Sequence, residues 1–308
     1  MPPADAAHTR AAVYLYTQTG QLREVADAFT APMRARGWDV RFVDVQPSTQ
    51  FPFPWPIRRF FEVFPRAVDP RATVDLVEPP DGFGSAPDEL VILGSQVWYL
   101  APSLPIRSLL SSHPEAVRGR DVVVLIACRN MWYSAAIELT ALLTSAGARS
   151  VRVVVATDTR RSATTLVTTL RWLLTGRREA FLWFGRAGVG DDELRRVSAE
   201  GRELADGRPC SPRSAPVAPA LAMADLWAGN VFRLFAPTVD KARRVGFVAH
   251  TTALVLFVVG LAVAIVFGLP LIGVAALLGG PTLARRVGEH VHRRITSAVP
   301  LSDQEMAV

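Results

Sequence analysis

The sequence predicts an α/β protein with a doubly wound, five-stranded parallel sheet, followed by a C-terminal transmembrane helix or helical hairpin. Two observations predict the sheet: apolar runs rich in strand-forming residues recur along residues 11–156, and segments with helical periodicity separate them. A third predicts the membrane segment, because residues 247–267 form a run of 21 residues without a formal charge. A chain of 308 residues can hold one such domain and an appendage.

Each expected element follows from its own pattern. Strands are expected over residues 11–16, 38–45, 90–93, 121–127 and 151–156, and helices over 20–37, 105–112, 135–146, 162–174 and 191–205. The first helix carries one apolar face, made of Leu22, Val25, Ala26, Phe29 and Met33. The helix over 162–174 has an expected buried stripe of Leu166, Leu170, Leu173 and Leu174. Five such units match the flavodoxin-like strand order 2-1-3-4-5, in which a ligand binds beyond the carboxyl ends of the strands.

Charge and composition divide the chain into three parts. We expect a flavodoxin-like domain over residues 11–205 with an aromatic insertion at 51–80, a linker and juxtamembrane segment at 206–240, and a membrane-attached segment at 241–294. The last part holds seven basic residues and one acid (7 − 1 = +6), and the net charge of the whole chain is also +6. Basicity that flanks an apolar run is typical of a membrane anchor and argues against a nucleic-acid-binding face.

The turn after the first strand is the predicted phosphate site. It contains Thr17, Gln18, Thr19, Gly20 and Gln21, with Leu22 opening the helix. Unpaired amides at a helix N-terminus bind phosphate, the threonine hydroxyls add donors, and a glycine permits close approach of the backbone. The turn lacks the glycines of a dinucleotide fingerprint and the lysine of a P-loop, so a single phosphate fits better than a pyrophosphate. The alternative is an ordinary capped strand-to-helix turn.

Two further loops should lie at the same edge of the sheet. One follows the third strand and contains Ser95, Gln96, Val97, Trp98 and Tyr99; the other follows the fourth and contains Cys128, Arg129, Asn130, Met131, Trp132 and Tyr133. Exposed aromatic side chains are explained if they stack on a flat ligand such as an isoalloxazine ring. The alternative is that these aromatics cover the core or contact a partner.

These motifs resemble known families. Residues 16–21 (YTQTGQ) are similar to the Ser/Thr-x-Thr-Gly-x phosphate loop of the flavodoxin and FMN-reductase superfamily, and residues 94–99 to its first ring-flanking loop. More narrowly, segments 16–22, 51–55, 61–65, 128–132 and 171–176 resemble the flavodoxin-like family labelled dialkylresorcinol condensing enzyme, over roughly residues 11–205. The resemblance implies flavin mononucleotide (FMN) as cofactor, held by the three loops.

Two residues of the second loop bear on the chemistry. Carbon–carbon condensation needs a nucleophilic cysteine with a positioned histidine and either an asparagine or a second histidine. Cys128 lies at a suitable strand end, but no suitably placed histidine is evident in the sequence, and the alternative is a buried, inert thiol. Arg129 would favour a reduced, anionic flavin ring. The same bulky loop could instead fill the pocket.

The insertion after the second strand is strongly aromatic. Residues 51–56 (FPFPWP) precede a short amphipathic pattern with Ile57, Phe60, Phe61 and Phe64 on one face. Three roles are open: a lid over the flavin, an interfacial helix on the bilayer surface, or an apolar stripe packed on the core of the domain.

The C-terminal segment predicts attachment to the cytoplasmic face of a membrane. Basic clusters flank it, so a hairpin interrupted near Pro270 would keep both on one side. The N-terminal residues 1–10 carry no secretory signal. We therefore expect a membrane-attached, FMN-dependent oxidoreductase or electron-transfer protein acting on an apolar small molecule, with membrane lipid as a partner and no bound metal or nucleic acid. The alternatives are a flavin-free accessory protein that recruits biosynthetic partners and, third, a condensing enzyme.

Overall fold

The structure, a computed structural model, describes residues 9–208 and 215–295. Its centre is a parallel sheet of five strands in the order β2-β1-β5-β7-β8. These strands are β1 (Arg10–Leu15), β2 (Asp39–Asp44), β5 (Glu89–Trp98), β7 (Asp121–Cys128) and β8 (Ser150–Thr157). The order confirms the predicted 2-1-3-4-5 arrangement, and Leu15 of β1 is in register with Gly94 of β5. The chain therefore reverses direction of winding between β1 and β5, as a doubly wound sheet requires.

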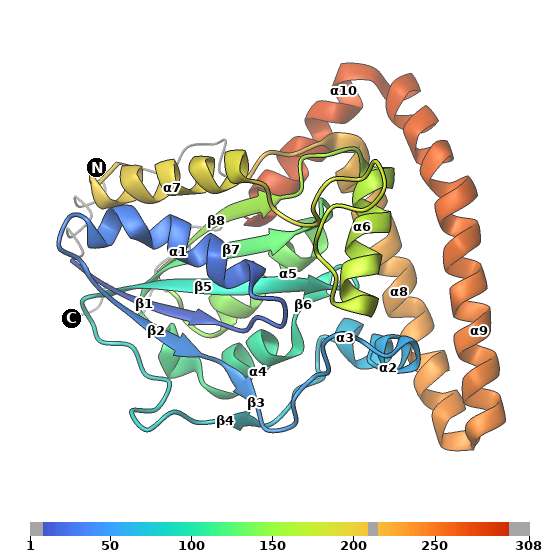
Figure 1. Cartoon of the computed structure of the whole chain (residues 1–308), viewed down its shortest axis with the longest axis horizontal. Helices are drawn as coiled ribbons and strands as arrows, with labels where there is room; N and C mark the ends of the chain where they lie inside the picture. The colour runs from blue at the N-terminus through green and yellow to red at the C-terminus, as the bar shows by residue number, and fades with distance from the viewer. Residues whose placement is uncertain (1–8, 209–214, 296–308) are drawn as a thin grey trace, which may run out of the picture.

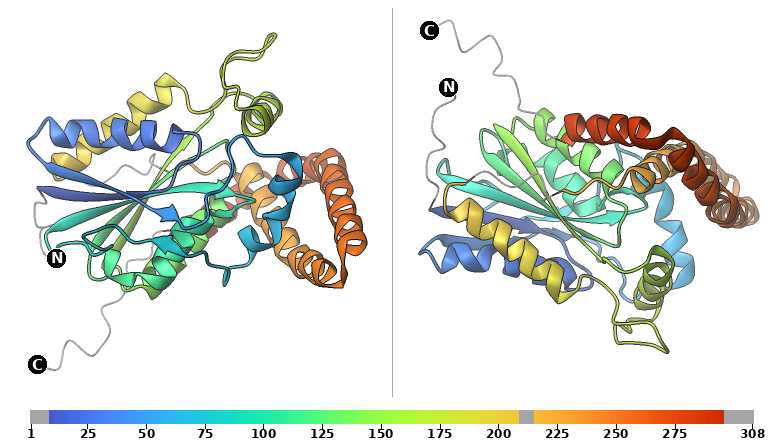
Figure 2. Two further views of the ribbon diagram at one scale, coloured as in Figure 1. Left: turned by 60° about the horizontal axis from the view of Figure 1, so that its bottom comes forward. Right: turned by 90° about the horizontal axis from the view of Figure 1, so that it is seen from above.

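Helices cover both faces of the sheet (Figure 2). On one face, α1 (Gln21–Arg34) and α7 (Asp191–Ala205) pack on apolar side chains of β1, β5 and β7. On the other lie α4 (Leu104–Ser112), α5 (Tyr133–Ser145) and the end of α10 (Leu269–Ile295). The predicted apolar face of α1 is confirmed, because Leu22, Val25, Ala26, Phe29 and Met33 are all buried. Both faces are apolar, which explains the nearly continuous Val/Ile/Leu strands.

Helix α6 (Ser162–Thr175) differs from the expectation. Its buried residues are Thr165, Thr168 and Trp172, whereas Leu170 is exposed and the other three leucines of the predicted stripe are only half-buried. The helix lies at the carboxyl end of the sheet and not on its face (Figure 1). The place on the face beside α1 is taken by α7, so the leucine side of α6 has no sheet to pack against.

The insertion after β2 forms small elements beyond the carboxyl edge. Strands β3 (Gln46–Pro47) and β4 (Leu76–Val77) pair antiparallel. The chain between them contains α2 (Ile57–Glu62) and α3 (Phe64–Val68). Two minor elements follow elsewhere, β6 (Ala101–Pro102), antiparallel to β5, and the 3₁₀ turn Pro114–Ala116. The predicted amphipathic helix is only partly present: α2 ends at Glu62, Ile57 is exposed, and Phe64 is buried but belongs to the next helix, α3.

The expected linker is largely helical. Residues Pro219–Val245 form α8, which packs on α3 and α5 and so belongs to the folded domain. The residues on its buried side are spaced alternately three and four positions apart, as in an amphipathic helix: Ala222, Asp225, Gly229, Phe232, Ala236 and Val239. This pattern was present in the sequence and was missed. The rest of the expected linker lies partly outside the described residues, which exclude 209–214.

The apolar C-terminal segment forms one long helical stretch. After the turn at Gly246, with φ of 144°, α9 (Phe247–Val263) runs back along α8, continues through the π-helical segment Ala264–Gly268 and enters α10. The chain bends at Gly280, where φ is 55°, and not at Pro270. The predicted interruption at Pro270 is therefore wrong. The π-helical segment supplies the local adjustment that lets a helix pass a proline.

Candidate functional site

The predicted phosphate loop forms a half-exposed turn at the carboxyl end of β1. The N–H of Gly20 donates to Thr17 Oγ1 at 3.1 Å, and the N–H of Gln21 donates to Thr19 Oγ1 at 3.4 Å. Gly20 has φ of 78°, and a Cβ there would meet nothing within 4 Å, so glycine is required by the backbone angle and not by crowding. Both hydroxyls keep their own hydrogens for a ligand.

The other three residues of the loop have structural roles. Gln21 is buried, and its Oε1 accepts from the N–H of Val189 at 3.3 Å, so its side chain points away from the turn. Leu22 is part of the core. Gln18 Nε2 donates to the carbonyl of Pro52 at 3.2 Å, which joins the loop to the aromatic insertion. Gly188 stands against the Gln21 amide so closely that a Cβ would clash with it.

A carboxylate stands in the first turn of α1, where the sequence analysis named none. Glu24 pairs with Arg178, whose Nη2 lies 2.8 Å from Glu24 Oε2. The hydrogen bond from Arg178 lowers the pKa of Glu24 below its usual value. Arg178 also donates from Nε to the carbonyl of Ala187 at 3.1 Å. The guanidinium therefore offsets a negative charge that would otherwise repel a phosphate near the helix N-terminus.

The predicted first ring loop is mostly strand, because residues 95–98 are the last four of β5 and only Tyr99 follows it. Ser95 is buried and donates to the carbonyl of Gln96 at 3.1 Å, while Val97 and Trp98 pair with β6. Tyr99 has φ of 49° and donates from its hydroxyl to the carbonyl of Phe60 at 2.6 Å. Burial raises the pKa of Tyr99 well above its usual value. Tyr99 thus belongs to the contact with the insertion.

Four aromatic side chains form a cluster over the carboxyl ends of β1 and β5. Trp98 lies edge to face with Tyr16, Phe51 and Trp55, with ring centroids 6.0, 4.8 and 5.8 Å apart. We call Tyr16, Phe51, Trp55 and Trp98 the aromatic cluster. Two of its members come from the insertion, so a segment distant in sequence closes this edge of the sheet. A lid over the ligand was one of the three roles predicted for this insertion.

The second ring loop is mostly internal, which corrects the expectation of exposed aromatics there. Trp132 and Tyr133 are each 1% exposed, and their rings stack with centroids 4.3 Å apart. The Tyr133 hydroxyl accepts from the N–H of Ala218 at 3.0 Å. For these two residues the alternative holds: they cover the core, because α8 packs over them.

The polar residues of the same loop lie against the start of α6. Arg129 donates from Nη1 to the carbonyl of Ser162 at 3.1 Å, and its Nη2 is 3.8 Å from Met131 Sδ. Burial lowers the pKa of Arg129 from its usual value, although an arginine stays protonated at neutral pH. Asn130 Nδ2 donates to Ser162 Oγ at 2.9 Å. Arg129 and Asn130 remain at the edge, whereas the two aromatics do not.

Cys128 is half-buried and lacks the lowered pKa of a nucleophilic thiol. Burial, followed by the nearby Asp225 carboxylate, raises the pKa of its thiol well above the usual value. A thiol in that state is protonated at neutral pH, whereas catalytic cysteines have lowered pKa values. Cys210 lies outside the described residues. The described part of the chain contains no group of three or more His, Cys, Asp or Glu side chains able to hold a metal ion.

Buried polar atoms without a partner gather at this edge. In the described part of the protein, Gln96 Oε1, Ser103 Oγ, Asn130 Oδ1 and Arg160 Nη1 are buried and have no hydrogen-bond partner. Gln96 lies near the carboxyl end of β5, while Ser103, Asn130 and Arg160 follow β6, β7 and β8. A ligand of a doubly wound sheet binds at this end of the strands. Each such atom costs about 1–3 kcal/mol when left unpaired. A ligand that donates to Gln96 and Asn130 would remove this cost.

Comparisons with known proteins identify no family. No protein-family model and no curated protein sequence matches the chain. Among solved structures, a putative flavoprotein from Bacteroides eggerthii DSM 20697 is 15% identical and covers 47% of this chain and 86% of its own, with a TM-score of 0.37. A flavodoxin from the domain Archaea and oxidised Flavodoxin 1 from Bacillus cereus are each 12% identical over 64% of this chain and 96% and 97% of their own, with TM-scores of 0.35 and 0.34. The fold assignment rests on the strand order, and the resemblance to the dialkylresorcinol condensing enzyme family stays a prediction.

Proposed function

We propose that the carboxyl edge of this sheet binds FMN and that the protein is a membrane-attached flavoprotein acting on an apolar electron acceptor. One observation carries the proposal: a phosphate-type turn and four unpartnered buried polar atoms lie at the same edge of a doubly wound sheet. The donor set fits a single phosphate, because the hydroxyls of Thr17 and Thr19 and the amides of α1 that follow Gln21 supply donors without a lysine.

The remaining residues have defined roles in this proposal. Bound FMN supplies the redox chemistry. Gln96 Oε1 and Asn130 Oδ1 are the free acceptors for ring or ribityl N–H and O–H donors. Arg129 places a positive charge at this edge, which favours an anionic form of a bound ring. The pairing of Glu24 with Arg178 keeps the carboxylate from repelling the phosphate.

The insertion acts as the lid of the site. Phe51 and Trp55 lie on Trp98, and two hydrogen bonds fix the segment: Gln18 Nε2 to the Pro52 carbonyl at 3.2 Å, and the N–H of Trp55 to the Leu173 carbonyl at 2.8 Å. In this closed arrangement the aromatic cluster excludes water from the edge. Entry of a flavin ring therefore requires the segment around Phe51 to move away from Trp98.

Membrane attachment is the second part of the proposal. The segment Phe247–Val274 is the one helix among the described residues that is long and apolar enough to cross a membrane, and 7% of its most apolar window is buried. Val255, Leu256 and Val259 are among its exposed side chains, while Phe257 faces α3 and α8. Lipid is the natural covering for such a surface. An acceptor dissolved in the bilayer would reach the protein on this side.

A second candidate is a flavin-free accessory protein at the membrane. The observation that favours it is the closed aromatic edge, with Trp132 and Tyr133 inside the core and Phe51 on Trp98. In this case the same membrane attachment would recruit biosynthetic proteins, and the fold would carry no redox chemistry.

Binding measurements with paired ligands separate the two candidates. We expect detergent-purified full chain to bind FMN, and the Thr17→Val and Thr19→Val variants to lose about 10-fold or more in affinity, the scale of one hydrogen bond to a charged group. Riboflavin, which lacks the phosphate, should bind the variants and the parent equally. Ser112→Val, an exposed hydroxyl on α4, is the matched control. An equal FMN affinity in all four proteins would contradict the assigned phosphate site, and no FMN binding at all would favour the accessory protein.

A further inference from the structure

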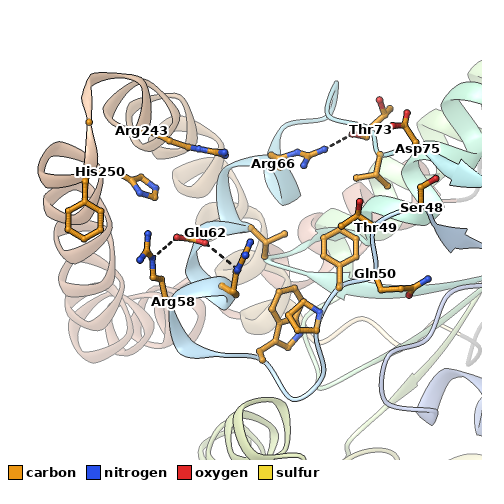
Figure 3. A pocket seen from close by; sticks show the side chains of 18 residues that line it. Ser48, Thr49, Gln50, Arg58, Glu62, Arg66, Thr73, Asp75, Arg243 and His250 are labelled. Atoms are coloured by element: carbon orange, nitrogen blue, oxygen red, sulfur yellow. Dashed lines mark hydrogen bonds and ion pairs between the residues drawn. The ribbon is translucent and has the colours of Figure 1, made fainter.

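A second site lies between the insertion and the turn that joins α8 to α9. A cavity of about 860 Å³ opens there, outside the phosphate loop and the second ring loop. Figure 3 shows its two walls: residues 48–75 on one side, and the α8–α9 turn with Arg243 and His250 on the other. The volume is that of a small-molecule site. Because the second wall belongs to the apolar C-terminal segment, the cavity forms only when that segment docks.

The charged residues of the cavity are mainly arginines. Arg58, Arg59, Arg66 and Arg243 line it, against the two carboxylates Glu62 and Asp75, so its formal charge is 4 − 2 = +2 before any contribution from His250. Glu62 is already shared, with its carboxylate oxygens 2.7 Å from Arg58 Nε and 3.9 Å from Arg59 Nε. A cluster of guanidinium groups in excess over carboxylates is suited to a phosphate.

Two of these arginines have no carboxylate partner among the described residues. Arg66 donates from Nη2 to the neutral carbonyl of Thr73 at 2.8 Å, and no ion pair of Arg243 is recorded within the described ranges. They come from opposite walls, Arg66 from α3 and Arg243 from the end of α8 (Figure 3). An anion between the walls would therefore receive donors from both.

The cavity also has an apolar side that continues to the exposed helix. Phe51, Trp55, Val63 and Phe247 line it, and the Arg58 guanidinium lies over the Phe247 ring at 5.3 Å from its centroid. Phe247 and the following Val248 are 67% and 77% exposed at the start of the apolar helix. Polar and apolar walls thus meet where the membrane segment begins, the position of the headgroup region of a bilayer.

We infer that this cavity binds the anionic headgroup of a membrane phospholipid, with the phosphate between Arg66 and Arg243 and the acyl chains along the exposed side of α9. The inference rests on the proposed membrane attachment and is independent of flavin binding. A headgroup held in this way would fasten the insertion, and so the lid of the aromatic cluster, to the lipid surface.

Short-chain lipids test the inference on the detergent-purified full chain. Titration calorimetry with dihexanoyl phosphatidylglycerol, dihexanoyl phosphatidylcholine and inorganic phosphate separates the sources of the anion. We expect the anionic lipid to bind at least about 10-fold more tightly than the zwitterionic lipid with the same chains, and inorganic phosphate to bind more weakly than either, because it makes no apolar contacts. Equal affinity for the two lipids would overturn headgroup recognition. Phosphate binding as tight as that of the anionic lipid would assign the cavity to free phosphate.

Matched variants locate the site. Arg243→Gln and Arg66→Gln should each lower the affinity for the anionic lipid about 10-fold. Arg244→Gln is the control, because Arg244 lies on the same helix end but pairs with Asp240 at 2.8 Å and does not line the cavity. If Arg243→Gln binds like Arg244→Gln, the assignment is wrong. FMN affinity, measured on the same samples before lipid is added, should not change, so a failure of this inference is distinguishable from a failure of the flavin site.

Discussion

Asp225 of α8 caps the start of α5, because its carboxylate accepts from the N–H of Ser134 at 2.9 Å and from the N–H of Tyr133 at 3.2 Å. The carboxylate is 0% exposed. A buried acid therefore joins the C-terminal helices to the α/β domain through the positive end of a helix dipole. The contact explains why α8 packs on the domain instead of forming a free linker.

Burial of this carboxylate makes stability depend on pH, and it outweighs the hydrogen bonds from Ser134 and Tyr133, which lower the pKa of Asp225. Burial raises the pKa of Asp225 from 3.8 to about 6. The native state then binds more protons than the unfolded state between these two values, so stability should fall as pH rises from about 4 to about 6, by up to ~3 kcal/mol for a shift of this size. Asp225→Asn should remove this part of the slope. The measurement is the difference in melting temperature between parent and variant across that pH range, and parallel curves would contradict the assignment.

Arg107 and Glu138 form a buried ion pair that holds the insertion. Arg107 is fully buried, donates to Glu138 Oε1 at 2.8 Å and to the Ala67 carbonyl at the end of α3 at 2.8 Å. Arg233 of α8 reaches the other oxygen of Glu138 at 3.3 Å. Glu138→Gln leaves Arg107 without a counter-charge and should destabilise the protein by about 3–5 kcal/mol.

The matched control for that pair is Glu115→Gln. The Glu115 carboxylate is exposed and pairs with His113. A surface change of this kind should stay within about 0.5 kcal/mol. Chemical denaturation of the purified full chain measures both. Similar losses in the two variants would show that the buried pair contributes little.

The thiol of Cys128 should react slowly. Burial and the Asp225 carboxylate raise its pKa, so the thiolate fraction at pH 7–8 is far below that of an ordinary cysteine. In a Cys210→Ala background, we expect labelling by an aromatic disulfide reagent to be slow and nearly flat over this range. Rapid labelling with a midpoint near neutral pH would contradict the prediction that this thiol is inert. It would favour the alternative that the protein is a condensing enzyme.

The exposed aromatic turn Phe181–Phe184 should contact lipid. Trp183 is 82% and Leu182 69% exposed at its tip, and Arg171 lies over the Phe181 ring at 4.8 Å. In both views of Figure 2 the yellow-green loop after α6 projects away from the sheet and away from α9. In proteoliposomes, brominated lipid should quench parent fluorescence more than that of Trp183→Phe. Trp38→Phe, at the amino end of β2, is the control, and equal quenching in both variants would contradict the contact.

The sequence predicted the sheet well because strand and helix periods are local signals. The strand runs ending near Leu15, Cys128 and Thr157 are set by continuous burial, and their order follows from the alternation with helices. The apolar stripe of α6 was predicted wrongly because periodicity shows which side of a helix is apolar but not whether a sheet is there to cover it. Trp172 and Thr165, not the leucines, meet the protein.

The site was predicted in part. The turn at Gly20 was recognisable because its residue types are required by backbone geometry. The burial of Trp132 and Tyr133 could not be predicted from the sequence, because it depends on α8. That helix is more than 80 residues away along the chain. Glu24 and Arg178 are still farther apart, at 154 residues along the chain, and their pairing left no local pattern. Long-range packing therefore decides which of the predicted ring residues remain at the edge.

The most direct test of the flavin account is the cofactor content of detergent-purified full chain. We expect FMN, released by denaturation and identified by mass spectrometry, at close to one molecule per chain, together with an absorption band near ~450 nm that dithionite bleaches. A colourless protein that releases no flavin and binds no added FMN would contradict the account.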